Sequence, residues 1–243
     1  MTLGNRPLNP AELVSPEFRL VLGHIHRVMA SNHPVRDLQS FPGKSCTGKG
    51  VTMEGWKHWA YPFLLLGLES MGLLRVEPPG VFGLPEKRLF ILGDGKGPLH
   101  GFLSFYGASV WAVDHEYFQI EGLTRQTDNL TRVVCPSDRG LPFGESTFDA
   151  GIVLGYEVTD PILKEVTHLI KPNGPLVFVL HGPWGWWSEP EYEALLSGQG
   201  LTSPGKTQDP CIESYEGYIS AVEGAQLGSR EVWFGLSTSK VTA

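Results

Sequence analysis

The stretch Leu89-Phe-Ile-Leu-Gly-Asp-Gly-Lys-Gly97 places a short apolar run directly before three alternating glycines. Such a run is typical of a buried strand, and Pro98 after it suits the first turn of a helix. Glycines between a strand and a helix let the backbone approach a ligand closely, and the helix N-terminus directs N–H groups outward. The pattern therefore predicts either a site for an anionic or polar ligand or an ordinary tight turn.

The glycine spacing separates this loop from two other phosphate-binding loops. A dinucleotide fingerprint has the form Gly-x-Gly-x-x-Gly, and Pro98 stands where its third glycine would be. A P-loop needs Gly-Lys-Ser/Thr, which this loop lacks. Asp114 ends the next apolar run. A carboxylate there can accept hydrogen bonds from both ribose hydroxyls of an adenosine ligand, or it can be an ordinary surface group at a strand end.

Short apolar runs alternate with helical patterns after Pro85, which indicates βαβ units and a mainly parallel sheet. Strands are predicted over 88–92, 109–113, 132–135, 148–154 and 175–180, with helices over 99–106, 160–170 and 188–197. Two late strands, 218–222 and 231–236, are predicted to form an antiparallel pair.

The residues before the sheet carry two helical patterns. Ser15 is a suitable N-cap for the first helix. The second pattern covers 56–71, with Gly72 as a plausible C-terminal cap. Pro62 lies inside it and is expected to kink the helix or split it in two. Residues 1–86 are therefore expected to form a helical cap on the sheet domain.

Composition narrows the possible partners. The chain has 19 Lys and Arg against 26 Asp and Glu, a net charge of −7, which argues against a nucleic-acid backbone as partner. Its three cysteines are far apart and no spacing predicts a metal site, so we expect a reduced, cytoplasmic protein. The longest mostly apolar run, 60–68, is far shorter than the ~20 residues that span a bilayer. We expect a monomer or homodimer without a membrane partner.

Four segments in the second part of the chain resemble the motifs of class I S-adenosylmethionine-dependent methyltransferases. They are Leu89–Gly97, Val110–Asp114, Gly140–Asp149 and Glu165–Gly174. The resemblance covers 88–182. It implies an α/β fold with a doubly wound, mainly parallel seven-stranded sheet that ends in an antiparallel hairpin strand. Residues 1–86 would be an N-terminal helical cap and 87–243 the Rossmann-like, S-adenosylmethionine-binding domain.

The resemblance also implies S-adenosylmethionine as the cofactor and gives its binding residues one by one. The three glycines would flank the methionine part, Asp114 would hold the ribose, and residues 137 and 138 would lie beside the adenine. The residues expected to bind the cofactor are Gly93, Asp94, Gly95, Gly97, Asp114, His115, Ser137, Asp138 and Leu154.

Methyl transfer is an in-line displacement on an activated sulfonium, so alignment matters most and contributes roughly 7–11 kcal/mol. A general base adds about 10²–10⁴-fold. His181 follows the fifth predicted strand, at the edge where open α/β sheets bind ligands. His115 is the other candidate base, and either residue can instead be an ordinary loop histidine. The resemblance places Tyr156 at the methyl-transfer face, so His181 and Tyr156 are the predicted catalytic residues.

Three tryptophans follow His181 within one loop and are costly to expose. They are interpreted either as an aromatic wall for an apolar or planar substrate, or as packing against the N-terminal helices. The aromatic residues of the second predicted helix allow the same two interpretations. The predicted substrate-binding residues are Trp56, Trp59, Tyr61, Trp184, Trp186 and Trp187.

The sequence therefore predicts a methyltransferase that acts on a small, apolar or aromatic molecule. Two departures from the family pattern support an alternative. Ile91 stands where the family usually has an acidic residue, and Ser137 stands where it usually has Asp. The alternative is a methyltransferase-like protein that has lost methyl transfer and serves as a structural or partner-binding subunit, or catalyses another reaction in the same pocket.

Overall fold

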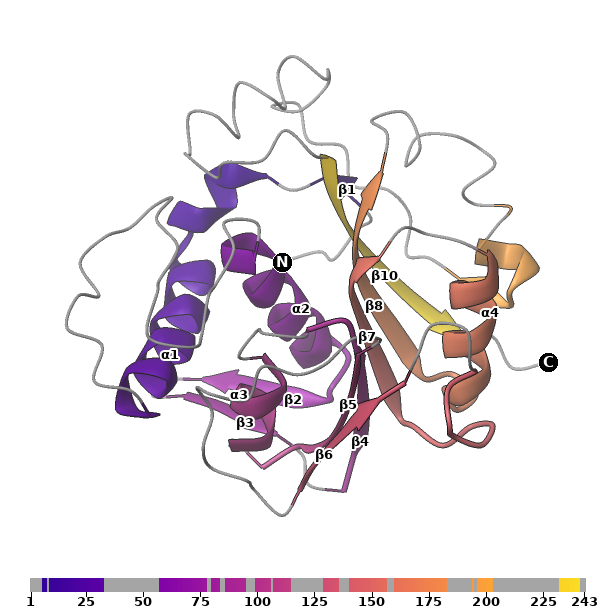
Figure 1. Cartoon of the computed structure of the whole chain (residues 1–243). Coiled ribbons are helices and arrows are strands. Elements are labelled where there is room, and N and C mark those ends of the chain that lie inside the picture. The colour runs from indigo at the N-terminus through magenta and orange to yellow at the C-terminus, as the bar shows by residue number, and fades with distance from the viewer. Residues whose placement is uncertain are drawn as a thin grey trace.

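A mainly parallel β-sheet with helices on both faces organises the chain (Figure 1). The computed structural model describes residues 6–7, 9–32, 57–77, 80–83, 86–94, 99–105, 107–114, 129–135, 140–156, 160–182, 194, 196–202 and 232–240. The parallel strands are β4 (Arg88–Leu92), β5 (Ser109–Asp114), β6 (Leu130–Val134), β7 (Ala150–Tyr156) and β8 (Pro175–Gly182). These five strands confirm the predicted parallel sheet, with boundaries that differ by at most two residues from those predicted.

The strand order makes this sheet doubly wound. Across the sheet the parallel strands follow one another as β6-β5-β4-β7-β8. Among the parallel strands, β4 comes first in the chain and lies in the middle. Strands β5 and β6 follow on one side of β4, and β7 and β8 lie on its other side. Ligands of open α/β sheets bind outside the carboxyl ends of the strands at such a reversal. The topology therefore predicts a ligand site at the carboxyl ends of β4, β5 and β7.

The sheet continues beyond β8 with antiparallel pairing. Strand β10 (Val232–Lys240) runs antiparallel to β8, and β1 (Arg6–Pro7) and β9 (Leu201–Thr202) each pair with β10. The described residues thus form an eight-stranded sheet, against the seven strands expected. The terminal antiparallel strand is present, whereas its predicted partner over 218–222 lies outside the described residues. Two-residue strands such as β1 and β9 are too short to leave a pattern in the sequence.

The N-terminal region contains the 3-10 helix η1 (Pro10–Val14), helices α1 (Pro16–Asn32) and α2 (Lys57–Ser70), and a hairpin of β2 (Leu74–Glu77) and β3 (Gly80–Gly83). The backbone N–H of Phe18 donates to Ser15 Oγ at 3.2 Å, which confirms the N-cap. Gly72 has a φ of 71°, the left-handed conformation of a C-terminal cap.

Helix α2 is continuous through Pro62, so of the two expected outcomes, a kink or a split, the split is wrong. Almost every side chain around this part of the helix is buried, including Trp59, Phe63 and Leu64, which are fully inaccessible. Packing on all sides holds the helix together and outweighs the local cost of a proline. The helix lies against β8 and β10, as Figure 1 shows.

Among the described helices, none is long and apolar enough to cross a membrane.

One hydrophobic core runs from the N-terminal helices into the sheet. Helix α3 (Leu99–Phe105) packs on β5 and β6, and α4 (Asp160–Leu169) covers the sheet on the side opposite α1 and α2 (Figure 1). Since β1 also extends the sheet, the N-terminal residues are packed into the same body as the later strands. The boundary between 86 and 87 stays a prediction.

The carboxylate of Asp149 ties the amino ends of two strands together. It accepts hydrogen bonds from the Arg88 backbone N–H at 2.9 Å and from Lys171 Nζ at 2.8 Å. Burial raises the pKa of Asp149, but these two hydrogen bonds and the charges of Lys171 and Lys87 lower it below its ordinary value of 3.8. This group therefore stabilises the fold in its ionised form.

We expect that stabilisation to disappear in acid. Because the pKa of Asp149 is lower in the folded chain than in the unfolded chain, its contribution is present above about pH 4 and is lost as the pH falls through the folded value. The free energy of unfolding in urea, measured from pH 7 to pH 3, should differ between the wild type and Asp149→Asn at neutral pH. The two should converge below pH 4, and a constant difference would contradict this assignment.

A turn over residues 171–174 precedes β8, and its last residue must be glycine. The Gly174 N–H donates to the Lys171 carbonyl oxygen at 2.9 Å, and Asn173 has a φ of 62°. A Cβ added at Gly174 would lie 2.5 Å from Ile170 Cγ2 and 2.8 Å from the carbonyl oxygens of Asp149 and Lys171. Two of these three neighbours are backbone atoms that cannot rotate away.

Replacing Gly174 by alanine should therefore lower the free energy of unfolding by about 1–3 kcal/mol, the usual cost of overpacking. Gly23→Ala is the matched control, because a Cβ there meets nothing within 4 Å. Gly23 lies inside α1, where alanine is favoured over glycine by roughly 0.5–1 kcal/mol. Chemical denaturation should therefore give a lower free energy of unfolding than wild type for Gly174→Ala and a higher one for Gly23→Ala. Equal changes in the two variants would show that the close contacts of the added Cβ do not cause the loss.

Candidate functional site

The predicted cofactor-binding residues that the structure describes gather at one edge of the sheet. Leu92, the last residue of β4, pairs with Val113 of β5 on one side and with Val153 of β7 on the other. The residues that follow these three positions are Gly93, Asp114 and Leu154. The structure thus brings a glycine turn, a carboxylate and the end of β7 together at the carboxyl edge, where the strand order reverses.

Gly93 starts the turn in a conformation that suits glycine. Its φ of 91° lies in the region that L side chains rarely adopt. Its N–H donates to the Val113 carbonyl oxygen at 3.0 Å, which fixes the start of the turn beside the end of β5. Gly95 and Gly97, which complete the motif, lie outside the described residues.

Asp114 is partly exposed at the end of β5. Its backbone carbonyl accepts a hydrogen bond from the Cys135 N–H at 2.9 Å, which extends the pairing of β5 and β6 by one residue. Asp114 therefore belongs to a well-held strand end and is only partly covered. This placement fits a residue that accepts hydrogen bonds from a polar ligand, and the ribose assignment stays a prediction.

Asp94, the next residue after Gly93, is 1% exposed. Its Oδ1 accepts a hydrogen bond from the Tyr61 hydroxyl at 2.8 Å. Its Oδ2 lies 2.9 Å from His100 Nδ1 and accepts a second hydrogen bond from the His100 backbone N–H at 3.3 Å. Both oxygens thus have partners within the chain.

The environment of Asp94 keeps it ionised. Burial raises the pKa of this carboxyl, but the hydrogen bond and charge of His100, the charge of Lys57 and the Tyr61 hydroxyl together lower it below the ordinary value. Lys57 is itself buried, as the first residue of α2. A buried charge is tolerated only where such partners surround it.

The end of β7 is irregular at Gly155. This residue has a φ of 73°, and the pairing with β8 shifts between Leu154, opposite Val179, and Tyr156, opposite Leu180. A bulge of this kind redirects the residues after it and is common beside active sites. The side chain of Leu154 is fully buried in this structure.

The two predicted catalytic residues lie on neighbouring strands. Tyr156 is the last residue of β7, and His181 lies near the end of β8, opposite Trp233 of β10. Both therefore occupy the carboxyl edge in backbone position. Their catalytic roles stay predictions.

Two predicted substrate-binding residues have partners inside the protein. Trp59 and Tyr61 are fully inaccessible. The Trp59 indole N–H donates to a carboxylate oxygen of Glu12, and its ring stacks on Phe63 at a centroid distance of 4.7 Å. Tyr61 donates to Asp94, a contact that the sequence did not predict. The remaining predicted site residues lie outside the described part of the chain: His115, Ser137, Asp138, Trp56, Trp184, Trp186 and Trp187.

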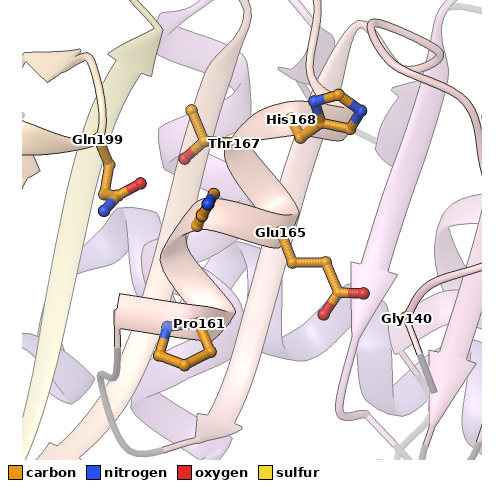
Figure 2. Close-up of a pocket in the computed structure, with 7 residues that line it drawn as sticks. Gly140, Pro161, Glu165, Thr167, His168 and Gln199 are labelled. Carbon is orange, nitrogen blue, oxygen red and sulfur yellow. The ribbon is translucent and has the colours of Figure 1, made fainter.

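A cavity of about 700 Å³ lies beside α4. It is lined by Gly140, Pro161, Lys164, Glu165, Thr167, His168 and Gln199 (Figure 2). Glu165 points toward Gly140 in Figure 2, and its carboxylate accepts a hydrogen bond from the Leu141 backbone N–H. None of Gly93, Asp114 and Leu154 lines the cavity. No pattern in the sequence indicates this cavity, because the polar face of an amphipathic helix is ordinarily just solvated.

The sequence matches no protein-family model and no curated protein. Solved structures that resemble the chain include geranyl diphosphate methyltransferase in complex with its methyl donor, with 18% identity over 75% of this chain and 88% of that one, at a TM-score of 0.49. Another is the 1,6-didemethyltoxoflavin-N1-methyltransferase of Burkholderia thailandensis, with 17% identity over 64% and 72% of the two chains and a TM-score of 0.46.

Since these TM-scores are below 0.5, the assignment of the fold rests on the strand order of the chain itself. Five parallel strands in doubly wound order, followed by an antiparallel strand, are what the sequence resemblance implies. The chain has a doubly wound, Rossmann-like α/β fold. The fold alone does not establish an activity, which depends on the residues of the site.

Proposed function

We propose that this protein is an S-adenosylmethionine-dependent methyltransferase. The observation that carries the proposal is the position of Gly93 and Asp114 at the carboxyl ends of adjacent strands, where the strand order reverses. The positive φ of Gly93 opens the backbone for close approach, and the carboxylate of the partly exposed Asp114 can accept hydrogen bonds from the two ribose hydroxyls. Both features fit the adenosyl and methionine parts of the proposed cofactor.

The other predicted residues complete the proposed site. Gly95 and Gly97 would extend the contact with the methionine part, Ser137 and Asp138 would border the adenine with His115 near them, and Leu154 with Tyr156 would border the transferring methyl group. The cofactor supplies a methyl group that is already activated on its sulfonium. The protein therefore has mainly to align the acceptor and exclude water, and His181 would remove a proton where the acceptor arrives protonated.

We further propose that the acceptor is a small, apolar or aromatic molecule. The tryptophans at 184, 186 and 187 follow His181 directly, and large aromatic side chains beside a site are suited to apolar or planar ligands. Residues 1–86 would form the cap over the site in a cytoplasmic monomer or homodimer.

Calorimetric titration of the purified protein with S-adenosylhomocysteine tests the first step. Saturable binding at micromolar to submillimolar concentrations is expected, and the absence of binding up to millimolar ligand would remove the proposal. Transfer is then measured with isotopically labelled S-adenosylmethionine against a panel of small aromatic acceptors.

Loss of methyl transfer is the second candidate function, and two observations favour it. Ile91 occupies the position of the family's acidic residue. Its side chain has no polar group and is fully buried, so it cannot hydrogen-bond a ligand. The nearby carboxylate of Asp94 already has partners on both oxygens. Binding of the cofactor without turnover of any acceptor would support this alternative.

A further inference from the structure

The cavity beside α4 contains a buried hydroxyl group. Thr167 lines this cavity, is 6% exposed, and lies next to Val166 and one turn after Leu163, which are both buried. Its Oγ1 has no hydrogen-bond partner among the described residues. Buried hydroxyl groups ordinarily have a partner, because they have lost their hydrogen bonds to water. Thr167 can therefore donate a hydrogen bond to a molecule that enters the cavity.

Two further donors lie beside this hydroxyl on the same helix. Lys164 and His168 also line the cavity, three positions before Thr167 and one position after it. Residues three and four positions apart on a helix are neighbours, so Lys164 is adjacent to both Thr167 and His168. Lys164 brings a positive charge, and an imidazole ring has an N–H donor whether it is neutral or protonated. No described residue forms an ion pair with Lys164.

Gln199 adds a donor from another segment of the chain. It lines the same cavity and lies just before β9, where its backbone N–H donates to the Leu196 carbonyl oxygen at 3.1 Å. Figure 2 shows its side-chain amide extending toward α4, on the side of the helix where the Thr167 hydroxyl lies. An amide has two N–H donors. Donor groups from two separate segments therefore line this side of the cavity.

Glu165 is the acidic residue of the described lining, and it lies on another side. Its carboxylate accepts a hydrogen bond from the Leu141 backbone N–H, and in Figure 2 it points toward Gly140 and away from Gln199. A backbone donor thus partly compensates its negative charge. The same hydrogen bond joins the segment 140–141 to α4 and fixes the wall of the cavity there.

We propose that this cavity is a binding site for a small phosphate monoester. The donors to its phosphate group are Lys164, Thr167, His168 and Gln199. The terminal oxygens of a phosphate monoester accept hydrogen bonds from several directions, which suits donors at separate positions, and lysine binds phosphate as a point charge. A carboxylate is instead matched by the fork of an arginine, and no arginine is among the described residues that line the cavity.

The size of the cavity leaves room for the organic part of such a ligand. Its volume of about 700 Å³ lies within the range of roughly 300–1,000 Å³ that is usual for small-molecule sites. Pro161 contributes an apolar surface to the lining. None of these residues is a predicted cofactor-binding residue, so the inference stands apart from the proposed function.

Calorimetry with phenyl phosphate tests the site, with inorganic phosphate and benzoate as comparisons. Phenyl phosphate should bind saturably in the millimolar range or below. Inorganic phosphate should bind more weakly because it lacks an organic part, and benzoate should bind about tenfold more weakly because it loses at least one hydrogen bond between charged groups. Absence of binding of both phosphate compounds at tens of millimolar would overturn the proposal. Equal affinities for benzoate and phenyl phosphate would contradict the phosphate assignment.

Thr167→Val removes the hydroxyl and keeps the branched shape of the side chain. Phenyl phosphate should then bind about tenfold more weakly, whereas Thr167→Ser, which keeps a hydroxyl, should stay within about twofold of wild type. Because the hydroxyl has no partner in the chain, Thr167→Val should not lower the free energy of unfolding in urea. A lower free energy would show that the hydroxyl already serves the fold, and equally weak binding in the two variants would show that the hydroxyl does not bind the ligand. Either result would count against the site.

Lys164→Gln tests the charge, and Arg19→Gln is its matched control. Both residues are exposed, and Arg19 lies on α1, across the sheet from α4. Lys164→Gln should weaken phenyl phosphate binding at least about tenfold, whereas Arg19→Gln should leave it within about twofold of wild type. Equal losses would mean that the net charge attracts the probe, and unchanged binding in both Lys164→Gln and Thr167→Val would place the probe elsewhere on the chain. Both results would overturn the proposal.

Discussion

Replacing Phe148 by alanine is expected to lower the free energy of unfolding by about 3–5 kcal/mol, the usual cost of deleting a buried phenylalanine ring. Phe148 is fully inaccessible and lies just before β7, where it forms a single parallel bridge with Ile170. Its ring centroid is 5.1 Å from Phe143, 5.3 Å from Phe90 and 5.7 Å from Trp111. The substitution removes the ring that three other aromatic rings contact.

A cation also lies over this cluster. The guanidinium carbon of Arg88 is 4.5 Å from the Trp111 ring centroid and 5.7 Å from that of Phe148. Such contacts add roughly 0.5–1 kcal/mol where the cation stays hydrated, so burial remains the larger contribution. The backbone N–H of Phe148 also donates to the Leu169 carbonyl oxygen at 3.0 Å, a hydrogen bond that alanine keeps.

Denaturation in urea or guanidinium measures the effect. Val14→Ala is the control, because Val14 is 64% exposed and its truncation should change the free energy of unfolding by no more than about 0.5 kcal/mol. A loss below 1 kcal/mol in Phe148→Ala would mean that the surrounding rings collapse into the space. The aromatic cluster would then be less important to the fold than its burial implies.

The sequence predicted the parallel sheet because each strand is a short apolar run bounded by glycine, proline or a charged residue. The β4 run is an example, with Arg88 before it and Gly93 after it. Residues of this kind at the ends of an apolar run can be recognised from the local sequence without knowledge of the rest of the fold. Strands β1 and β9 have no such signal, since two residues acquire strand geometry only through pairing with β10. The hairpin of β2 and β3 was missed although Pro78, Pro79 and Gly80 mark a turn.

The sequence predicted which residues lie together only where their positions depend on local sequence. Gly93 and Asp114 lie together because both follow parallel strands, which a motif in the right order can indicate. The bond between Tyr61 and Asp94 joins residues from different parts of the chain, so no local pattern contains it. Its one trace in the sequence is chemical: a tyrosine within an apolar helix needs a partner for its hydroxyl when buried.

Asp114→Ala should weaken the binding of S-adenosylhomocysteine by about 1.5–3 kcal/mol, or roughly 10- to 100-fold, if the carboxylate holds the ribose. Asp114 is partly exposed at the end of β5, and thermal denaturation checks that Asp114→Ala keeps the fold. Glu86→Ala, which removes an equal charge from an exposed position before β4, is the control and should bind as the wild type does.

An analogue of S-adenosylhomocysteine that lacks both ribose hydroxyls makes this test specific. If Asp114 accepts hydrogen bonds from those hydroxyls, the wild type should lose affinity for the analogue, whereas Asp114→Ala should bind both ligands about equally. Equal losses in the two proteins would mean that the carboxylate acts elsewhere. Since the proposed function depends on this carboxylate lying beside the Gly93 turn, that result would leave the chain with a Rossmann-like fold and no assigned ribose contact.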